Sequence, residues 1–390
     1  MTFKDFAYIV IYLIKRLMYG ILLILPIDKY SIYINNFDGK GFDDSAKYVC
    51  LAISEKYPNI KIYWLGNYKK CECKNVKFVK RGSLNSVVRQ ATSKIWISNV
   101  RMPAFSVKRK NQIYIQMWHG IFGIKKIENE IPDALTHRYI WKAKYDSRIT
   151  DYYISANADN TKSFKKYFWR NNGKILEVGD PRDDIIINAT DKEVSALKQK
   201  YGYENIKLCL YAPTFRKDGG IRAYNINYNE LIKSLNHKYG GKWKIIIRLH
   251  PNIADKAKSQ IQYDDNIING SDFKCMEELL LISDVVITDY SSICFDFLYT
   301  GKPIFIYASD IDEYSKDRDF HIQLTDLPFS IATNNDELDK SISKFDICDF
   351  HNKCNEFMDR FGFIKTGDAT EKVCDLIENV IENNDLQVKD

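Results

Sequence analysis

The sequence predicts an α/β protein made of two Rossmann-like domains, and three observations lead to this fold class. Strand-like and helix-like segments alternate along most of the chain, a pattern typical of parallel sheets joined by right-handed βαβ units. The alternation restarts near the middle of the chain, so two such sheets are expected. The chain has 390 residues, more than the roughly 250–300 at which a single hydrophobic core stops growing.

The first element is an apolar segment at residues 6–27, with Lys15 and Arg16 at its centre. Each apolar half is too short to cross roughly 30 Å of hydrocarbon, and two central cations disfavour a span. No small-residue cleavage site follows, so we do not expect a signal peptide. Two interpretations stay open for residues 1–27. One is an interfacial helix on the inner leaflet with its cations reaching the headgroups, which we favour, and the other is a helix buried against the first domain.

The first domain is expected at residues 28–177. Its strand candidates are rich in β-branched and aromatic residues, as is typical of strands. The helix after the first strand has Asp43 or Asp44 near its N-terminus, where a short polar side chain can cap a helix. The expected strands are 30–36, 61–67, 76–81, 94–100, 112–118, 151–157 and 174–179, and the expected helices are 43–57 and 83–93.

The second domain is expected at residues 178–390. A helix at 190–201 restarts the alternation, and residues 278–299 have the pattern of a helix, a strand, a turn and a second helix. Helical periodicity returns near 353–383, where we expect a helix that closes the domain. The other expected strands are 206–215, 243–251, 266–269 and 302–309.

The formal net charge is +6, and the excess is concentrated in the first half of the chain. Residues 61–178 contain 24 Lys and Arg residues but only 8 Asp and Glu residues. Such a basic half favours an anionic neighbour, either nucleic acid, a phosphorylated substrate or an anionic membrane surface, although solvated surface lysines give the same excess. The nine cysteines form no paired CxxC motif, so we expect reduced thiols in a cytosolic protein.

The first candidate for chemistry is His119, within Trp118-His119-Gly120 at the end of the strand 112–118. Ligands of α/β sheets bind at strand ends, and an imidazole that is neutral near pH 7 can accept a proton from an attacking hydroxyl. The structural alternative is a histidine that packs or caps locally.

The second candidate is Arg248-Leu249-His250-Pro251, at the end of a strongly apolar strand. Strand alternation places Arg248 and His250 on one face. A cation beside an imidazole suits a phosphate or a leaving oxyanion, whereas the alternative for Arg248 is an ion pair with a nearby carboxylate.

The third candidate is the turn formed by Thr288, Asp289, Ser291 and Ser292, between a strand and a helix. The amides and the dipole of a helix N-terminus bind phosphate, but one of the serines could equally be a simple N-cap. Three further positions are weaker candidates of the same kind. Thr214 and Arg216 end another strand, and Arg182 follows a Gly-Asp-Pro turn.

Several motifs of other enzyme classes are missing from the sequence. It contains no GxxxxGK[ST], no GxGxxG after a strand and no HExxH, which weighs against ATP hydrolysis, dinucleotide chemistry and zinc peptidase activity. Asp310-Ile311-Asp312 resembles a metal-binding DxD, but a loop with two carboxylates is usually solvated. We therefore expect no metal site.

Taken together, these segments resemble the CDP-glycerol glycerophosphotransferase family of teichoic-acid synthesis. The resemblance covers residues 110–320 and rests on the order and spacing of the motifs. This family is similar to GT-B transferases, so the resemblance implies two Rossmann-like domains facing across a cleft, with the CDP donor in the second domain. The motifs are WHG (118–120) followed by Lys125-Lys126, GDPRDD (179–184), YAPTFR (211–216), RLHP (248–251), SDVVITDYSS (283–292), FDF (295–297) and GKPIFIY (301–307).

The resemblance also implies roles for individual residues. His119 and His250 match the family's two functional histidines, with His119 as the base for the acceptor hydroxyl and His250 assisting the departure of CMP. A second group is implied to bind the donor and its phosphates, and a third to lie on the acceptor side. The donor group is Thr214, Arg216, Arg248, Thr288, Asp289, Ser291 and Ser292, and the acceptor group is Lys125, Lys126 and Arg182.

The implied reaction transfers glycerol phosphate or ribitol phosphate from CDP-glycerol or CDP-ribitol to a polyprenyl-pyrophosphate-linked teichoic-acid or capsule precursor, releasing CMP. We expect no cofactor and no nucleic acid partner, and a peripheral location at the cytoplasmic face of a bacterial cell membrane. Two alternatives stay open: a GT-B glycosyltransferase that uses a UDP- or GDP-sugar on a lipid-linked acceptor, and a non-catalytic membrane-surface module that binds a nucleotide. The choice of polyol, primase or polymerase action, wall polymer or capsule, and the oligomeric state are not determined by the sequence.

Overall fold

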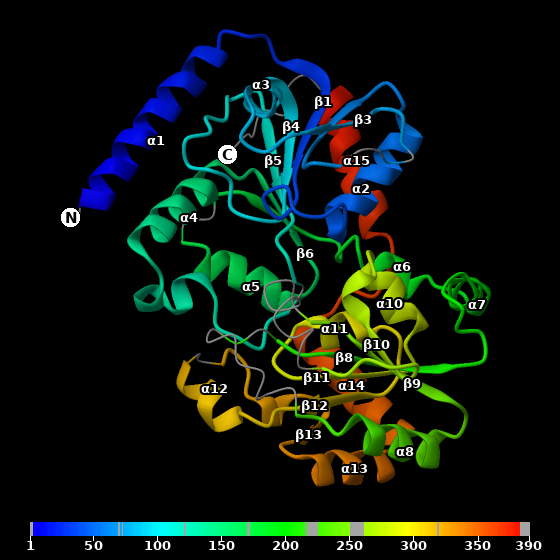
Figure 1. Ribbon diagram of the computed structural model, residues 1–390. Helices are drawn as coiled ribbons and strands as arrows, with labels where there is room; N and C mark the ends of the chain where they lie inside the picture. Colours follow the sequence, from blue (N-terminus) through cyan, green and yellow to red (C-terminus); the bar gives the residue numbers. More distant parts are fainter. Residues whose placement is uncertain are drawn as a thin grey trace. The chain divides into compact units, whose positions relative to one another are not determined.

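The fold is that of a computed structural model, which describes residues 3–68, 71, 73–120, 122–169, 172–214, 216, 225–249, 261–317 and 320–382 (Figure 1). The chain divides into two compact units. The first unit contains residues 1–119, 128–184 and 366–390, and the second contains residues 120–127 and 185–365. Each unit has its own parallel sheet covered by helices, which confirms the predicted α/β class. The predicted arrangement of two domains facing across a cleft stays a prediction.

The first unit is built on a seven-stranded parallel sheet with the order β3-β2-β1-β4-β5-β6-β7. The order reverses beside β1, as in dinucleotide-binding Rossmann sheets. Consecutive residues of its central strands are buried, since helices cover both faces of a parallel sheet. The strands are β1 (Asp28–Asn35), β2 (Lys61–Leu65), β3 (Val76–Val79), β4 (Ser93–Ser98), β5 (Ile113–Gln116), β6 (Tyr152–Ser155) and β7 (Lys174–Glu177).

Helices on the two faces of this sheet pack on separate cores. On one face, α2 (Asp44–Lys56) and α15 (Ala369–Glu382) share a core that includes Ile32, Ile97 and Ile377. On the other face, α1 (Phe3–Leu22) and α3 (Leu84–Thr92) pack with Tyr33 and Trp96. The remaining helices of this unit are α4 (His137–Ile149) and α5 (Ala158–Tyr167), with the 3-10 turns Glu128–Glu130 and Pro132–Ala134.

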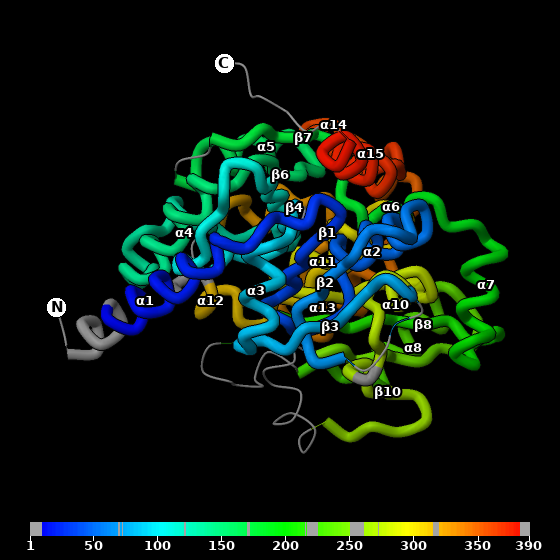
Figure 2. Tube along the Cα trace, turned by 90° about the horizontal axis from the view of Figure 1, so that it is seen from above, coloured from blue at the N-terminus to red at the C-terminus, as the bar shows by residue number. Residues whose placement is uncertain are grey.

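The C-terminal helix α15 belongs to the first unit, although the residues before it build the second (Figures 1 and 2). The Asp184 carboxylate accepts the backbone amides of Ala369 and Thr370 at 3.1 and 2.6 Å, and so caps the start of the helix. This division differs from the predicted boundary between residues 177 and 178, which left the C-terminal helix in the second domain. The sequence marks an amphipathic helix but does not say which sheet that helix covers.

One face of α1 packs on the first unit. Tyr19 is completely buried. The Tyr12 hydroxyl and the Arg16 guanidinium both donate to the Ala104 carbonyl, at 2.8 and 3.0 Å. One nitrogen of the Arg16 guanidinium is thus bound within the protein, and the prediction that the central cations reach membrane headgroups stays a prediction.

The opposite face of α1 is apolar and exposed. Leu13, Leu17 and Ile21 expose 56%, 72% and 62% of their surface. The packing of α1 on the first domain is thus observed, and the predicted interfacial position of its exposed apolar stripe stays a prediction. Among the helices that the structure describes, none is long and apolar enough to cross a membrane.

The second unit repeats the same sheet order with six parallel strands, β10-β9-β8-β11-β12-β13. Its strands are β8 (Lys207–Ala212), β9 (Trp243–Ile247), β10 (Ile267–Asn269), β11 (Val285–Thr288), β12 (Ile304–Tyr307) and β13 (Ser330–Ala332). Its helices are α6 (Asp184–Ile187), α7 (Asp191–Lys200), α8 (Tyr228–Tyr239), α10 (Met276–Ile282), α11 (Ile293–Leu298), α12 (Ile311–Asp317), α13 (Asn335–Ser343) and α14 (Ile347–Phe361), with 3-10 turns at Gly270–Asp272 and Leu324–Asp326.

Each predicted strand is present, and most end earlier than predicted. The residues that follow them leave the sheet: Trp118, for example, has a φ of 57° and cannot continue β5. The prediction missed the helices α4, α5, α6, α8, α12 and α13 and the edge strand β13. Most of these helices mix apolar residues with many charged or polar ones, so their helical periodicity is weak in the sequence.

Candidate active site

Both sheets reverse their strand order at one point, and polar residues gather at that point in each sheet. The reversal lies between β1 and β4 in the first sheet and between β8 and β11 in the second. Ligands of open α/β sheets bind beyond the carboxyl ends of these strands. The first sheet places Asn36 and Asn99 there, and the second places Thr214 and Asp289.

In the first unit, Asn99 is the centre of a buried hydrogen-bond network. Its side-chain amide donates to Asn36 Oδ1 at 2.7 Å and to Asp44 Oδ2 at 2.6 Å. Its side-chain oxygen accepts the backbone amide of Phe37 at 2.9 Å. Asn36, Asn99 and Asp44 are all buried. A buried polar network whose groups are paired holds a single geometry, so the carboxyl ends of β1 and β4 are fixed relative to α2.

His119 is attached to this network through the backbone of Asn99. Its Nδ1 lies 2.6 Å from the Asn99 carbonyl oxygen. A carbonyl only accepts, so Nδ1 carries the hydrogen and Nε2 is left as the acceptor. Desolvation lowers the pKa of His119 below its ordinary value, against opposing contributions from the Asn99 carbonyl and the Asp44 carboxylate. The residue keeps solvent access, so a neutral imidazole offers Nε2 to an incoming hydroxyl at pH 7.

The Trp118 ring packs against the His119 ring. The two rings stack with centroids 4.5 Å apart and planes 30° apart. Trp118 has a φ of 57°, a conformation that is strained for a bulky residue and persists where the surroundings enforce it. Two buried groups pack against the Trp118 ring: Phe168, with ring centroids 4.7 Å apart, and Arg101, whose guanidinium lies 5.3 Å away and is held by Asp146 and Glu128 at 2.9 and 2.8 Å.

Arg182, predicted on the acceptor side, contacts carboxylates of the first unit. Its NH1 donates to Asp44 Oδ1 at 3.1 Å, and its Nε lies 3.7 Å from Asp180 Oδ2. Burial raises the pKa of Asp180 to about 6, although the Arg182 charge opposes the shift. Ser45 donates to the Asp180 carboxylate from the start of α2. The geometry thus joins Arg182 to the His119 network through Asp44, and its contact with an acceptor stays a prediction.

In the second unit, Asp289 is the corresponding centre. Its Oδ1 accepts the backbone amide and the hydroxyl of Thr214 at 2.8 and 2.6 Å, and the amide of Tyr290 at 2.6 Å. Its Oδ2 lies 2.8 Å from Arg216 NH2. The predicted donor residues Thr214, Arg216 and Asp289 are therefore brought together by the structure.

Arg216 binds protein groups on three sides. It donates to both carboxylate oxygens of Asp310, at 2.5 and 3.0 Å, and to the Thr214 carbonyl at 2.7 Å, besides its pair with Asp289. The rings of Tyr290 and Tyr314 lie 5.0 and 4.9 Å from it. Asp310, the first residue of the DxD sequence, is thus neutralised by an arginine.

The turn after β11 divides into buried and accessible residues. Thr288 is completely buried and its hydroxyl donates to the Ala212 carbonyl at 2.7 Å, which joins β11 to β8. Ser291 and Ser292 are half-buried and precede α11. A side chain placed on Gly120 would come within 3.6 Å of Ser292 Oγ, so the segment that follows His119 in the chain approaches this turn. The predicted phosphate role fits Ser291 and Ser292 better than Thr288.

The remaining predicted site residues are Arg248, Lys125, Lys126 and His250. Arg248 NH1 donates to the backbone carbonyls of Gly270, at 2.7 Å, and Phe273. Lys125 lies 5.2 Å from the Tyr314 ring, and its backbone pairs with Phe320. Lys126 follows it on the same segment. His250 lies outside the described residues, so its predicted role is untested by the structure.

Sequence reasoning missed the residues that hold His119. Asn36, Asn99 and Asp44 carry no recognisable motif, and the sequence marks Asp44 only as a candidate helix cap. The available signal was positional, since Asn36 and Asn99 directly follow predicted strands at the carboxyl edge of one sheet. Within the described part of the chain, no group of three or more His, Cys, Asp or Glu side chains could hold a metal ion.

Comparisons with known proteins agree with this geometry. The family described as CDP-glycerol:poly(glycerophosphate) glycerophosphotransferase matches residues 17–379. A teichoic acid poly(glycerol phosphate) polymerase of Staphylococcus epidermidis is 33% identical over 90% of this chain, and the match spans 51% of that relative. A teichoic acid glycerol-phosphate transferase of Staphylococcus aureus is 29% identical over 90% of this chain and 93% of its own length.

Solved structures point to the same family. The wall teichoic acid polymerase TagF, in a histidine variant soaked with CDPG, superposes with a TM-score of 0.84 at 29% identity, covering 98% of this chain and 99% of that chain. A structure of Staphylococcus aureus MnaA with UDP has a TM-score of 0.58 at 12% identity and shares the fold alone. The chain therefore belongs to the CDP-glycerol:poly(glycerophosphate) glycerophosphotransferase family, the family that its motifs predicted.

Proposed function

We propose that this chain transfers glycerol phosphate or ribitol phosphate from a CDP-polyol to a lipid-linked teichoic-acid or capsule precursor and releases CMP. The observation that carries the proposal is the neutral, solvent-accessible His119 with its Nε2 free to accept, in a chain of this family. The chain spans about half of the first relative named above and nearly all of the second.

In the proposed reaction, a hydroxyl at the end of the acceptor attacks the phosphorus that bears the polyol. His119 Nε2 accepts the hydroxyl proton as the new P–O bond forms. The bond between that phosphorus and the bridging oxygen breaks, and CMP leaves with the oxygen and its electron pair. Phosphoryl transfer needs little covalent assistance beyond positioning and charge neutralisation, so the first unit supplies the base and fixes it through Asn99 and Trp118.

The donor is proposed to bind at the carboxyl edge of the second sheet. Ser291 and Ser292 offer hydroxyls and backbone amides beside the turn that Asp289 and Arg216 hold in place. Because two carboxylates already neutralise Arg216, we assign it a positioning role in this turn rather than direct contact with the donor phosphates. His250 and Arg248 keep their predicted roles toward the leaving CMP.

A membrane-surface location is proposed for the whole protein. The apolar face of α1 exposes Leu13, Leu17 and Ile21, and the chain around the first sheet is rich in lysine and arginine. Apolar side chains beside basic residues favour the surface of an anionic membrane. This arrangement suits an acceptor carried on a lipid at the cytoplasmic face.

The test is CMP release from CDP-glycerol and CDP-ribitol, each with and without a lipid-pyrophosphate acceptor that bears a glycerol phosphate primer. Acceptor-dependent CMP from one donor supports the proposal and identifies the polyol. UDP or GDP release from a sugar donor instead would support a glycosyltransferase. Binding of nucleotide with no release from any donor, by folded protein with lipid present, would support the non-catalytic module. Product length then separates a primase from a polymerase.

A further inference from the structure

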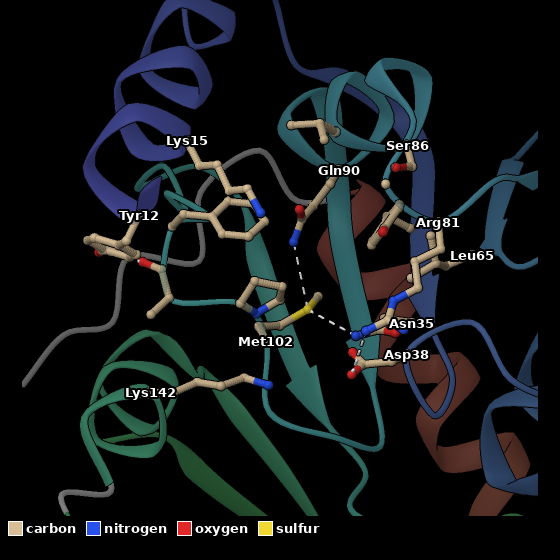
Figure 3. A pocket seen from close by; sticks show the side chains of 16 residues that line it. Tyr12, Lys15, Asn35, Asp38, Leu65, Arg81, Ser86, Gln90, Met102 and Lys142 are labelled. Atoms are coloured by element: carbon tan, nitrogen blue, oxygen red, sulfur yellow. Dashed lines mark hydrogen bonds and ion pairs between the residues drawn. The ribbon is translucent and has the colours of Figure 1, made fainter. Parts of the chain in front are cut away.

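A cavity of about 340 Å³ lies on the α1 and α3 face of the first sheet (Figure 3). It is enclosed by α1, by α3, by the carboxyl ends of β1 and β2 and by the chain after β4. Its wall at the end of β1 is Asn35, whose side chain lies on the same strand face as that of Tyr33. Asn36, next in the chain, instead binds Asn99 in the network that holds His119. The cavity is therefore distinct from the candidate catalytic network.

The cavity is cationic. Lys15 comes from α1, Lys142 from α4 and Arg81 from the turn before α3, and Asp38 is the single acidic side chain among its lining residues. Arg81 NH2 lies 3.3 Å from Asp38 Oδ2, so that pair is neutral. Lys15 lies 5.6 Å from the ring of Phe105, and Lys142 makes no ion pair with the described residues. Two positive charges thus remain for an anion.

The buried side-chain amide of Asn35 indicates that a ligand of this cavity also needs a hydrogen-bond donor. Asn35 exposes 1% of its surface, and its Oδ1 has no hydrogen-bond partner among the described residues. Its Nδ2 has only the weak acceptor Met102 Sδ, at 3.6 Å. A buried polar atom without a partner costs about 1–3 kcal/mol, so a hydroxyl that donates to Oδ1 is the partner this wall lacks.

We propose that this cavity is a second, non-catalytic binding site for a phosphodiester that carries a free hydroxyl, such as a glycerol phosphate unit. Lys15 and Lys142 bind the phosphate, and Asn35 accepts the hydroxyl hydrogen. Ile11 and Met18 lie about one helical turn before and after Lys15 in α1, and they expose 52% and 57% of their surface. The ligand is therefore presented next to the membrane-facing helix, either as a lipid headgroup or as a unit of a polyol phosphate chain.

The test measures binding of soluble glycerophosphoglycerol to the whole chain by calorimetry, with no CDP-polyol present. Lys142→Gln is expected to weaken binding at least about tenfold, because a charge-assisted hydrogen bond is lost. Lys144→Gln, on the same helix but exposed and outside the cavity, is the matched control and should bind like the wild type. Val87→Trp, which fills the cavity from α3, should also abolish binding in a protein whose thermal unfolding is unchanged.

Vesicles identify the source of the ligand. If Lys142→Gln reduces binding to phosphatidylglycerol vesicles but not to phosphatidylserine vesicles of equal charge, the ligand is the lipid headgroup. If Lys142→Gln weakens binding of soluble glycerophosphoglycerol but not binding to either kind of vesicle, the ligand is a polyol phosphate chain. The proposal is overturned if the wild type does not bind glycerophosphoglycerol at millimolar concentration, or if Lys144→Gln weakens binding as much as Lys142→Gln.

This inference rests on the proposed function only for the choice of a polyol phosphate as the ligand. Binding should survive in His119→Ala, which the proposed function expects to be inactive. Wild-type protein that binds glycerophosphoglycerol but releases no CMP from any CDP-polyol would overturn the proposed function alone. Wild-type protein that releases CMP but does not bind glycerophosphoglycerol would overturn this inference alone.

Discussion

The protonation state of His119 is decided by its neighbours rather than by its place in the WHG motif. The Asn99 carbonyl fixes the hydrogen on Nδ1, and desolvation keeps the ring neutral. The same atoms could have been arranged around a histidine that simply packs, and the sequence left that alternative open. What separates the two cases is that Nδ1 is bound to the Asn99 carbonyl, which leaves Nε2 as the acceptor of a residue that is exposed to solvent.

Replacement of His119 tests the base directly. We expect His119→Ala to lower kcat by about 10²–10⁴ with little change in KM for the CDP-polyol, because general base catalysis acts in the transition state. His237→Ala is a matched control, since His237 is an exposed histidine on α8. Steady-state CMP release measures both. Near wild-type turnover of a folded His119→Ala protein would show that another group takes the proton.

The pH dependence of kcat/KM below pH 7 also tests the assignment of His119 as the general base. A base acts in its neutral form, and the pKa of His119 is lowered from the ordinary value of 6.5. We therefore expect kcat/KM to be level near pH 7 and to fall only as the pH drops below about 6.5. The His119→Ala variant should lose this acidic limb. A limb that persists unchanged in the variant would belong to a different group, such as the carboxyl of Asp180.

In the second unit, the Asp289 carboxylate is the residue whose loss should be most damaging to the fold of the turn. Asp289→Asn removes the charge that faces Arg216 and leaves a buried guanidinium partly uncompensated. We expect the free energy of unfolding to fall by about 3 kcal/mol, as for other broken buried pairs. Denaturant unfolding measures this, with the exposed Asp265→Asn as control. Equal stability of the two variants would contradict the central role of Asp289.

At the scale of single elements, α1 was predictable in its composition but not in its orientation. The sequence shows a helix that is too interrupted to span a membrane, and the structure shows which side faces the protein. Tyr12, Arg16 and Tyr19 form the packed side, and Leu13, Leu17 and Ile21 form the exposed side. Both sides of α1 contain large apolar or aromatic residues, so periodicity alone does not predict which side packs on the protein.

The exposed side of α1 should carry membrane binding. We expect the double variant Leu17→Glu and Ile21→Glu to reduce sedimentation with anionic vesicles by at least about tenfold, because burying each apolar side chain contributes about 1.5–3 kcal/mol. Thermal stability should be unchanged, since both residues are exposed at 72% and 62%. Leu84→Glu, exposed at 68% on α3, is the control. Vesicle binding that is equally weakened by Leu84→Glu would argue against a specific role for α1.

Strands were predicted more reliably than helices, and the reason is physical. Strands of a parallel sheet are buried on both faces, so they appear as continuous runs of β-branched and aromatic residues, such as Ile245–Ile247 in β9. Helices such as α4 and α5 bury few apolar residues, since Ala143 in α4 and Phe164 in α5 are buried beside polar residues. Their N-caps, Thr136 and Asn157, form the expected hydrogen bonds, but single polar residues of this kind are common in loops as well.

At the scale of the whole molecule, the last helix closes the first unit. Ile377 is completely buried in the core that α15 shares with α2 and the first sheet. We expect Ile377→Ala to lower the free energy of unfolding by about 2–5 kcal/mol, as for other buried large-to-small changes. Asn379→Ala, an exposed position on the same helix, is the control. Hydrogen exchange should localise the loss to the first sheet, and a loss confined to the second sheet would contradict the assignment of α15.

The sequence by itself determined the fold class and the family, and it predicted residues of the candidate site such as His119, Thr214 and Asp289. Parallel sheets leave uninterrupted apolar strands, and a spaced series of short motifs is specific without any knowledge of contacts. Only the tertiary structure decided that Arg216 holds a turn through Asp289 and Asp310, that Asn36, Asn99 and Asp44 support His119, and that α15 covers the first sheet. These facts depend on contacts between residues far apart in the chain, and such contacts leave no local pattern in the sequence.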